Sequence, residues 1–352
     1  MKKIALGLLI ITNITFALEV DIIKNNVNFD HVYANIGTLH SRKGENQTLS
    51  WDDCGKAKTD KIVWGKSIGN YNSLEINNKL NNIEEFGTGL GGVQLGFDYR
   101  LKTKSEINNL FGVYATYTGS RSDLSTKKAI NKYDSNNISI ALNNTTYSKY
   151  GSYIDIVGQY TYTNQKFKHV YTADDIANIP KSIRKYKEPY YGHNFSMSVE
   201  VGRPFNINQS GWLLEPQGQI IYTLSVSKTT KLEAGGYMKK LEPALLHSLR
   251  GRVGLRLSNN SGSHTLNTNT GYVYTNLWVD PLKHNFLKAL NNSSYVYNNE
   301  TNNFKLFGEI GVGGQIPVLK NVYLYGDTSF RFGFVGKKYY EFKSNLGMKY
   351  NF

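Results

Sequence analysis

The chain has 352 residues, 40% of them hydrophobic, with 33 Gly, 26 Tyr and a single Cys. Its formal net charge of +14 attracts polyanions, but no aromatic-plus-basic RNA-binding motif is present, so nucleic acid is not an expected partner. The lone Cys54 excludes an internal disulfide framework, and we interpret it as an incidental thiol.

The first 17 residues, MKKIALGLLIITNITFA, have the three parts of a secretory signal peptide. Lys2 and Lys3 form the charged region, an apolar run follows, and Ala17 ends a plausible cleavage site. The apolar run is too short to span a bilayer, and no later run reaches the roughly 18 apolar residues of a membrane helix. An exported chain of this kind can enter a membrane only as a closed β-barrel.

Alternation of apolar and polar residues recurs along the rest of the chain. In YYEFKSNLGMKYNF (339–352), the apolar side chains from Tyr340 to Phe352 fall at even positions, and Glu341 and Lys349 fall at odd positions. Successive side chains of a strand point to opposite faces, so each such segment predicts a strand with one apolar face. About twelve such segments lie near residues 63, 92, 110, 138, 151, 193, 212, 249, 271, 304, 321 and 339.

The connections between these segments alternate between short and long. The short ones are 101–108, 148–150, 204–210, 259–264 and 317–320. The long, polar ones are 72–88, 123–136, 164–190, 227–246 and 281–303, while 334–338 is short where a long one is due. Outer-membrane barrels have short periplasmic turns and long outside loops, so the pattern favours such a barrel.

We therefore predict an all-β fold, a twelve-stranded antiparallel transmembrane β-barrel whose apolar face contacts lipid. A secreted soluble sandwich or jelly roll also alternates apolar with polar residues. Three features favour the barrel over it. The polar faces carry charges on nearly every strand, the strands can cross a bilayer at roughly 9–11 residues, and Tyr and Phe gather near strand ends as in interfacial girdles.

The segments also resemble, in order, the β-barrel translocator domain of autotransporters, the type V secretion system. The resemblance covers roughly residues 28–352. It is carried by Trp64 and Lys66, by VQLGFDYR and LFGVYATYTGSRSD, by Tyr153 and Asp155, by Glu200, Gly202, Glu215, Pro216 and Gln217, by RGRVGLRL, and by Tyr350-x-Phe352. It implies a translocator-type tube in the outer membrane of a Gram-negative cell, with no enzymatic activity and no cofactor.

The resemblance further implies a short helix in the lumen, just before the first strand. The matching segment is 28–44, in which Phe29, Val32, Tyr33 and Ile36 form a helical stripe. Either Asn28 or Asp30 could cap the start and Gly44 the end, although Gly37 interrupts the pattern. Fifteen helical residues span about 22 Å, close to the roughly 25 Å apolar band of such barrels. A disordered leader is the alternative.

The predicted organisation departs from the family at its N-terminal end. The expected units are a signal peptide (1–17), a vestigial passenger or leader (18–27), the plug helix (28–44), a linker (45–58) and the barrel (59–352). Autotransporters normally carry a long secreted passenger before the helix, whereas cleavage after Ala17 leaves only LEVDIIKNNV here. Some members cut the chain at an Asn-Asn pair in the helix; Gly37 and Thr38 stand at that place, so we expect no self-cleavage.

The polar strand faces are predicted to place a charged network in the lumen. Its members are Asp155, Glu200, Glu215, Arg250, Arg252, Arg256, Glu309, Asp327 and Arg331. A buried unpaired charge costs several kcal/mol, so these groups should pair with one another, with the helix or with lumen water. An ion-selective pathway is the functional alternative to this structural role.

No catalytic, cofactor or metal site is predicted. The seven His residues show no metal-ligand spacing. His193 and Ser196 resemble a lipase pair, but three positions apart on a strand they face opposite sides. The glycine-rich stretch 87–96 has no following helix to form a phosphate cradle.

The expected partners are outer-membrane lipid and lipopolysaccharide, together with the outer-membrane assembly machinery, and the chain is expected to be a monomer. In the family that the chain resembles, a last strand ending in Phe is the assembly signal, here Tyr350 and Phe352.

Two other functions stay open. One is an adhesin-like surface protein that binds a host or surface ligand through the basic stretch 167–189. The other is a small diffusion pore, if no helix occupies the lumen.

Overall fold

In the computed structural model, one sheet wraps around a short helical segment. The described residues are 27–45, 60–74, 85–101, 107–125, 129–171, 185–207, 211–227, 230–234, 237–241, 245–261, 269–281, 285–286, 299–300, 305–335 and 339–352. The predicted signal peptide, nearly all of the predicted leader and linker, and Cys54 lie outside these residues. No helix in this part of the chain has the length and apolar content to cross a bilayer.

Twelve long antiparallel strands form the wall. They are β1 (Lys61–Leu74), β2 (Glu85–Leu101), β3 (Ile107–Ser125), β4 (Ala129–Ser148), β5 (Tyr153–Tyr171), β6 (Lys185–Gly202), β8 (Trp212–Ser227), β11 (Leu245–Ser261), β12 (Asn269–Asp280), β15 (Lys305–Leu319), β16 (Val322–Val335) and β17 (Tyr339–Asn351). Short strands add β7 (Phe205–Asn206) beside β8 and the pairs β9 (Thr230–Ala234) with β10 (Tyr237–Leu241) and β13 (Asn285–Phe286) with β14 (Asn299–Glu300).

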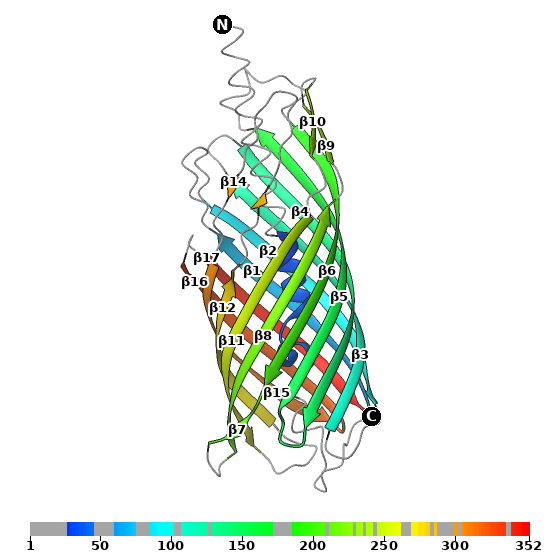
Figure 1. Ribbon diagram of the computed structural model, residues 1–352, viewed down its shortest axis with the longest axis vertical. Helices are drawn as coiled ribbons and strands as arrows, with labels where there is room; N and C mark the ends of the chain where they lie inside the picture. Colours follow the sequence, from blue (N-terminus) through cyan, green and yellow to red (C-terminus); the bar gives the residue numbers. More distant parts are fainter. Residues whose placement is uncertain are drawn as a thin grey trace.

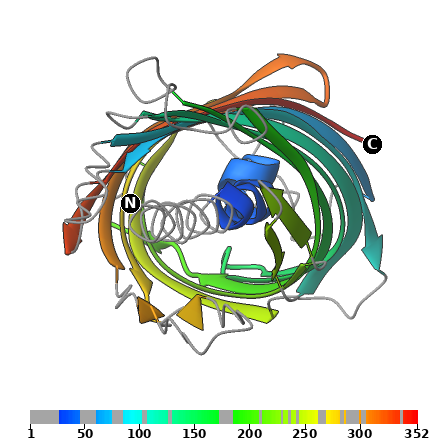
Figure 2. The ribbon, with the colours of Figure 1, turned by 90° about the horizontal axis from the view of Figure 1, so that it is seen from above.

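The first and last strands close the sheet into a barrel. β1 pairs with β17 along its length, from Ile62 opposite Asn351 to Leu74 opposite Tyr339. Each other strand of the wall pairs with its neighbours in chain order, and β8 pairs directly with β11. Figure 1 shows the tilted strands, and Figure 2, seen from above, shows the closed ring around the helix. The predicted twelve-stranded barrel is confirmed.

The two faces of the wall have opposite polarity, as the alternation predicts. On β17, Met348 is 56% exposed on the outer face, while the adjacent Lys349 is 1% exposed toward the lumen. On β11, Val253 is 62% exposed and Arg252 is 4% exposed. The same alternation places His193 on the outer side of β6 and buries Ser196 in the lumen, so the two cannot form a dyad.

The strand lengths correct several predicted loops. The predicted long connection 123–136 is wrong, because β3 continues to Ser125 and β4 begins at Ala129. The predicted loop 164–190 is also too long, since 164–171 belong to β5 and 185–190 to β6. The loops 227–246 and 281–303 contain the pairs β9–β10 and β13–β14. The outward side chains described in β3, β4 and β5 there are polar, so no apolar alternation predicts these parts as strands; they are Asp123, Lys132, Asp134, Asn136, Asn164, Lys166 and Lys168.

Uneven strand lengths give the barrel a tall side and a low side. β3 to β6 have 19, 20, 19 and 18 residues. β12 and β17, on the other side, have 12 and 13. The tall strands rise toward the end that carries the long connections, opposite the C-terminus (Figure 1). They exceed the roughly 9–11 residues needed to cross a bilayer, so they extend beyond it.

Glycines in the wall make room for large aromatic side chains that lie flat in the lumen. A Cβ at Gly96 would lie 2.3 Å from the ring of Trp64, which stands opposite on β1. A Cβ at Gly202 would lie 2.4 Å from the ring of Tyr153 on β5. Only a shift of the ring or of the strand would relieve such contacts.

We expect Gly96→Ala to destabilise the barrel by about 1–3 kcal/mol, because overpacking of a filled site costs this much. Gly89→Ala on the same strand is the control, since a Cβ there meets nothing within 4 Å. Denaturant unfolding in detergent measures the stability of both variants. The readout is the shifted mobility of the folded barrel on unheated gels. Equal loss of stability in the two variants would contradict the close-contact explanation.

Candidate functional site

A helical segment fills part of the lumen, and its first helix, 27–36, presents a polar stripe to the tall side. The Nδ2 atom of Asn28 donates to Asn194 Oδ1 at 2.7 Å. Both ring nitrogens of His31 lie 2.8 Å from hydroxyls of β3. Asn35 Nδ2 donates to Ser139 Oγ on β4 at 2.7 Å. Spacings of three and four residues bring these side chains onto one helix face.

An apolar stripe faces the other side. Val32 and Ile36 are fully buried against Ile221, Trp278 and Phe307. Phe29 packs against Leu246, with Tyr33 alongside. The Tyr33 hydroxyl hydrogen-bonds to Ser248, and the Arg250 guanidinium lies 3.7 Å from the centre of the Tyr33 ring. The predicted helical stripe of Phe29, Val32, Tyr33 and Ile36 thus lies against the wall.

The predicted single helix 28–44 is wrong in detail, because the helix breaks after residue 36. Gly37 has φ of 60°, and Thr38 caps a second helix, α2 (Leu39–Lys43), with a reciprocal capping box to Ser41. A positive φ suits glycine, and it ends the first helix here. Asn28 and Asp30 lie inside the first helix, which already includes residue 27, and their side chains bond to the wall instead of capping the helix. The predicted C-cap at Gly44 is confirmed.

The second helix and Glu45 just beyond it are held to four strands by ion pairs and by one histidine–carboxylate hydrogen bond. Arg42 Nη2 lies 2.6 Å from Asp155 Oδ2 on β5, and Lys43 Nζ lies 2.7 Å from Asp98 Oδ1 on β2. His40 Nε2 lies 2.9 Å from Glu215 Oε1 on β8. Just beyond the helix, Glu45 pairs with Arg256 of β11 at 2.8 Å. All of these side chains are at least nine-tenths buried.

Backbone carbonyls at the end of α2 are bound by the closing strands. Lys349 Nζ on β17 donates to the carbonyls of Lys43 and Glu45, at 3.2 and 2.5 Å. The Tyr325 hydroxyl on β16 donates to the Arg42 carbonyl at 2.8 Å. These contacts satisfy acceptors that a helix C-terminus otherwise leaves unpaired. The segment is therefore bound on all sides at its lower end.

The nine charged residues predicted for the lumen all have their side chains there. Asp155 pairs with the helix, as above, and Arg252 lies 2.9 Å from Glu200. Further distances are 3.4 Å for Arg256–Glu215, 3.6 Å for Arg331–Glu309, 2.5 Å for Arg331–Glu341 and 2.6 Å for Arg250–Asp280. Asp327 accepts from the Tyr274 hydroxyl at 3.1 Å and from Asn345 at 3.2 Å.

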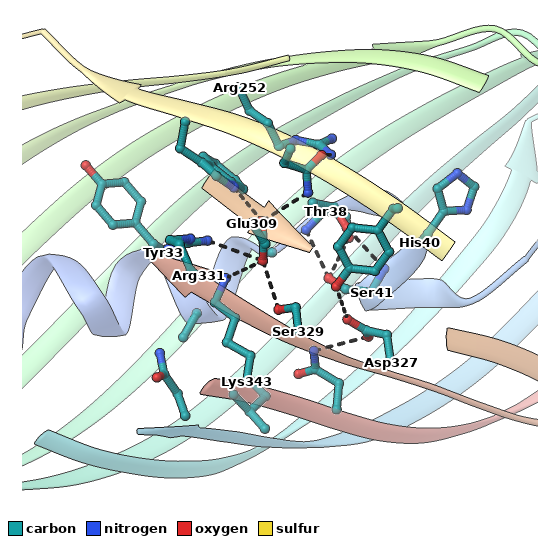
Figure 3. A pocket seen from close by; sticks show the side chains of 18 of the residues that line it. Tyr33, Thr38, His40, Ser41, Arg252, Glu309, Asp327, Ser329, Arg331 and Lys343 are labelled. Carbon is teal, nitrogen blue, oxygen red and sulfur yellow. Dashed lines mark hydrogen bonds and ion pairs between the residues drawn. The ribbon is translucent and has the colours of Figure 1, made fainter. Parts of the chain in front are cut away.

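A cavity of about 60 Å³ lies between the helix and the low side of the barrel. Figure 3 shows Glu309 at its centre, beside Arg331, Lys343 and Ser329, with Tyr33 and Thr38 of the helical segment also lining the cavity. Trp278 donates its indole N–H to Glu309 at 2.5 Å. The cavity holds a few waters at most, since each needs about 10–15 Å³.

The predicted lumen network contains Asp155, Glu215 and Arg256, which bind the segment, but most of the other wall residues that bind it were not predicted. Asp98 is central, because it accepts from Lys43 and from the indole N–H of Trp64 at 2.9 Å. The alternation of VQLGFDYR predicts that Asp98 points into the lumen, but it does not predict that Asp98 binds Lys43. In the described part of the chain, no group of three or more His, Cys, Asp or Glu residues could hold a metal.

Comparisons with known proteins agree with this geometry. The family model described as Autotransporter beta-domain matches residues 63–329. The chain belongs to the autotransporter β-domain family. It is thus a translocator-type barrel of the type V class in the outer membrane of a Gram-negative bacterium. No curated protein sequence matches it.

Three solved autotransporter structures are similar to it in fold. The transport unit of AIDA-I from Escherichia coli has a TM-score of 0.65 and 18% identity, covering 87% of this chain and 96% of that one. The β domain of Bordetella BrkA gives 0.63 and 16%, covering 83% and 100%. The translocator domain of NalP from Neisseria meningitidis gives 0.61 and 14%, covering 95% and 98%.

We expect Asp155→Ala to destabilise this autotransporter barrel by about 3–5 kcal/mol, because it leaves Arg42 buried and unpaired. The double variant Arg42→Met/Asp155→Leu should recover most of this loss, since it removes both charges. Denaturant unfolding in detergent gives both values, and Arg121→Gln, in an exposed pair, is the control that should show no change. With Arg42→Met and Asp155→Leu also measured singly, a double-variant loss equal to the sum of the two single losses would show that the groups do not interact.

Proposed function

We propose that the barrel is a translocator tube whose lumen holds its own segment 27–45 and is closed to solutes. The observation that carries this proposal is the set of contacts from α2 and Glu45 to the wall: ion pairs to β2, β5 and β11 and the His40–Glu215 hydrogen bond to β8. A segment bound to four different strands cannot leave the lumen without exposing several buried charges. The other members of the predicted network form ion pairs or hydrogen bonds within the wall, which favours a structural role for them over an ion pathway.

We further propose that the chain is exported by its N-terminal signal peptide and assembled as a monomer. Its short turns would face the periplasm and its long connections the outside, as in other outer-membrane barrels. Transport units of this kind are not catalytic, and we assign this chain no enzymatic activity or cofactor. Lipid, lipopolysaccharide and the assembly machinery are the partners that this proposal requires.

Planar-bilayer conductance tests the closed lumen. We expect the complete chain to insert with little conductance, and a variant lacking residues 28–44 to give a large, stable conductance. A second variant, Arg42→Gln/Lys43→Gln/Glu45→Gln, keeps the segment but removes its charges, and it should open intermittently. Arg121→Gln/Asp134→Asn, outside the lumen, serves as the control.

Equal and large conductance from the complete chain and the deletion variant would overturn the plug and favour the diffusion pore. If the deletion variant does not assemble, the charge-removed variant carries the test, because its wall is unchanged. Steady closure of that variant would show that the ion pairs do not hold the segment.

We also propose that the terminal Tyr350-x-Phe352 is the assembly signal. Both rings are exposed on the outer face, 5.1 Å apart, and the backbone of Phe352 pairs with Lys61 at the seam between β1 and β17. An unpaired strand edge can add to another sheet, so this strand is suited to recognition before the barrel closes.

We expect Phe352→Ala to lower the amount of assembled barrel in the outer membrane several-fold, because it removes the recognised ring. The stability of the purified, refolded barrel should hardly change, since the ring lies at the surface. Phe342→Ala, a lipid-facing aromatic on the same strand, is the control. An equal assembly loss in both variants would contradict a specific signal.

A further inference from the structure

The outer surface of the tall side carries an unpaired group of lysines, which we call the lysine ladder: Lys132 on β4, and Lys166 and Lys168 on β5. All three side chains are exposed. Lys132 stands directly opposite Lys168 in the register of β4 with β5. Lys187 occupies the position opposite Lys168 in the register of β5 with β6. Three lysine positions therefore run side by side across three strands.

This arrangement is unfavourable in isolation, because like charges directly opposite on neighbouring strands destabilise a sheet. Two acids lie close by, Asp123 opposite Lys132 and Asp134 opposite Lys166. Asp134, however, pairs with Arg121 at 3.0 Å. Within the residues that the structure describes, Lys132, Lys166 and Lys168 form no ion pair and no side-chain hydrogen bond. The ladder therefore keeps an excess of positive charge.

The ladder lies above the aromatic belt of the same strands, four to six residues further along them. Tyr117, Tyr162 and His193 belong to one cross-strand row, and Tyr160 and Tyr191 lie beside it. Below this row the outward residues are apolar, such as Ile140 and Met197. Such a tyrosine belt marks the boundary of the apolar band in outer-membrane barrels. The ladder thus lies on the outer side of the belt, beyond the hydrocarbon.

The height of the ladder narrows the choice of ligand. Lys166 and Lys168 follow Tyr162 by four and six residues, which is roughly 13 and 20 Å along a strand at 3.3 Å per residue. With a tilt of about 40°, they stand about 10–15 Å above the belt. The head-group layer of an ordinary phospholipid is only about 5–8 Å deep. A phosphate carried on a saccharide head group reaches the required height.

We propose that the lysine ladder binds the phosphate groups of a saccharide-headed lipid in the surrounding outer leaflet. The phosphates sit between the lysines of neighbouring strands and relieve their mutual repulsion, and each offers several acceptor oxygens to the ammonium groups. The inference rests on the proposed orientation, in which the tall side projects outward. It extends the proposed function, because it assigns the outer wall a lipid site that is independent of the lumen.

The experiment uses the complete chain in mixed lipid nanodiscs, with native mass spectrometry to count bound lipid. The probes are bis-phosphorylated lipid A, the same lipid without its phosphates, and heparin as a soluble polyanion. The test variant is Lys132→Gln/Lys166→Gln/Lys168→Gln. The matched control, Lys149→Gln/Arg203→Gln/Lys320→Gln, removes three exposed positive charges at the short-turn end.

We expect the test variant to bind phosphorylated lipid A at least tenfold more weakly than the wild type, since each basic residue near an anionic surface contributes a factor of about five. The control should bind as the wild type does, and dephosphorylated lipid should bind weakly to all three proteins. Unchanged lipid binding by the test variant would overturn the proposal. Ladder-dependent binding of heparin without lipid A would overturn it in favour of an adhesive surface.

Failure of this test is distinguishable from failure of the proposed function. The three lysines lie on the outside, so their replacement leaves the lumen contacts and the conductance unchanged. The shifted mobility of the test variant on unheated gels establishes that it has folded. Loss of lipid binding together with loss of that shift would indicate misfolding, and single lysine variants, each expected to weaken binding about fivefold, then decide the matter.

Discussion

The pairing of β1 with β17 is the constraint on which the rest of the structure depends. Within lipid, every backbone N–H and C=O group must find a partner inside the protein, because no water is present to replace it. The thirteen residue pairs from Ile62–Asn351 to Leu74–Tyr339 remove the two free edges at once. Only with the ring closed does the sheet acquire an outside for lipid and an inside that holds charge.

A closed ring of twelve strands then creates a lumen that has to be filled. An eight-stranded barrel is just filled by its own side chains, while sixteen strands leave an open channel. Here a helix about 10–12 Å across takes the space, and polar wall residues such as Asp98 and Asp155 bind it. Removing one partner of such a pair destabilises the barrel far more than the intact pair stabilises it, because the remaining charge stays buried without a partner. The pairs therefore specify where the segment sits.

Much of the wall could be predicted from sequence, because alternation acts residue by residue. Met348 and Lys349 face opposite sides as their positions require, and the lumen location of Arg252 or Glu200 follows in the same way. The partners of these groups could not be predicted, since Lys43 and Asp98 meet through helix rotation and strand register together. Alternation also fails on the tall side: Lys132 points outward and Ser135 inward, yet both are polar, so the sequence predicts a loop where β4 begins.

Quenching of tryptophan fluorescence by brominated lipids tests the central claim, that lipid covers the outer face and polypeptide fills the inner one. One protein keeps Trp278, which is 5% exposed in the lumen, as its only tryptophan. The other has Ile140→Trp as its only tryptophan, at a position that is 57% exposed on the outside. The closed, plugged barrel predicts strong quenching at position 140 and almost none at 278. Similar quenching at the two positions, or none at either, would contradict it.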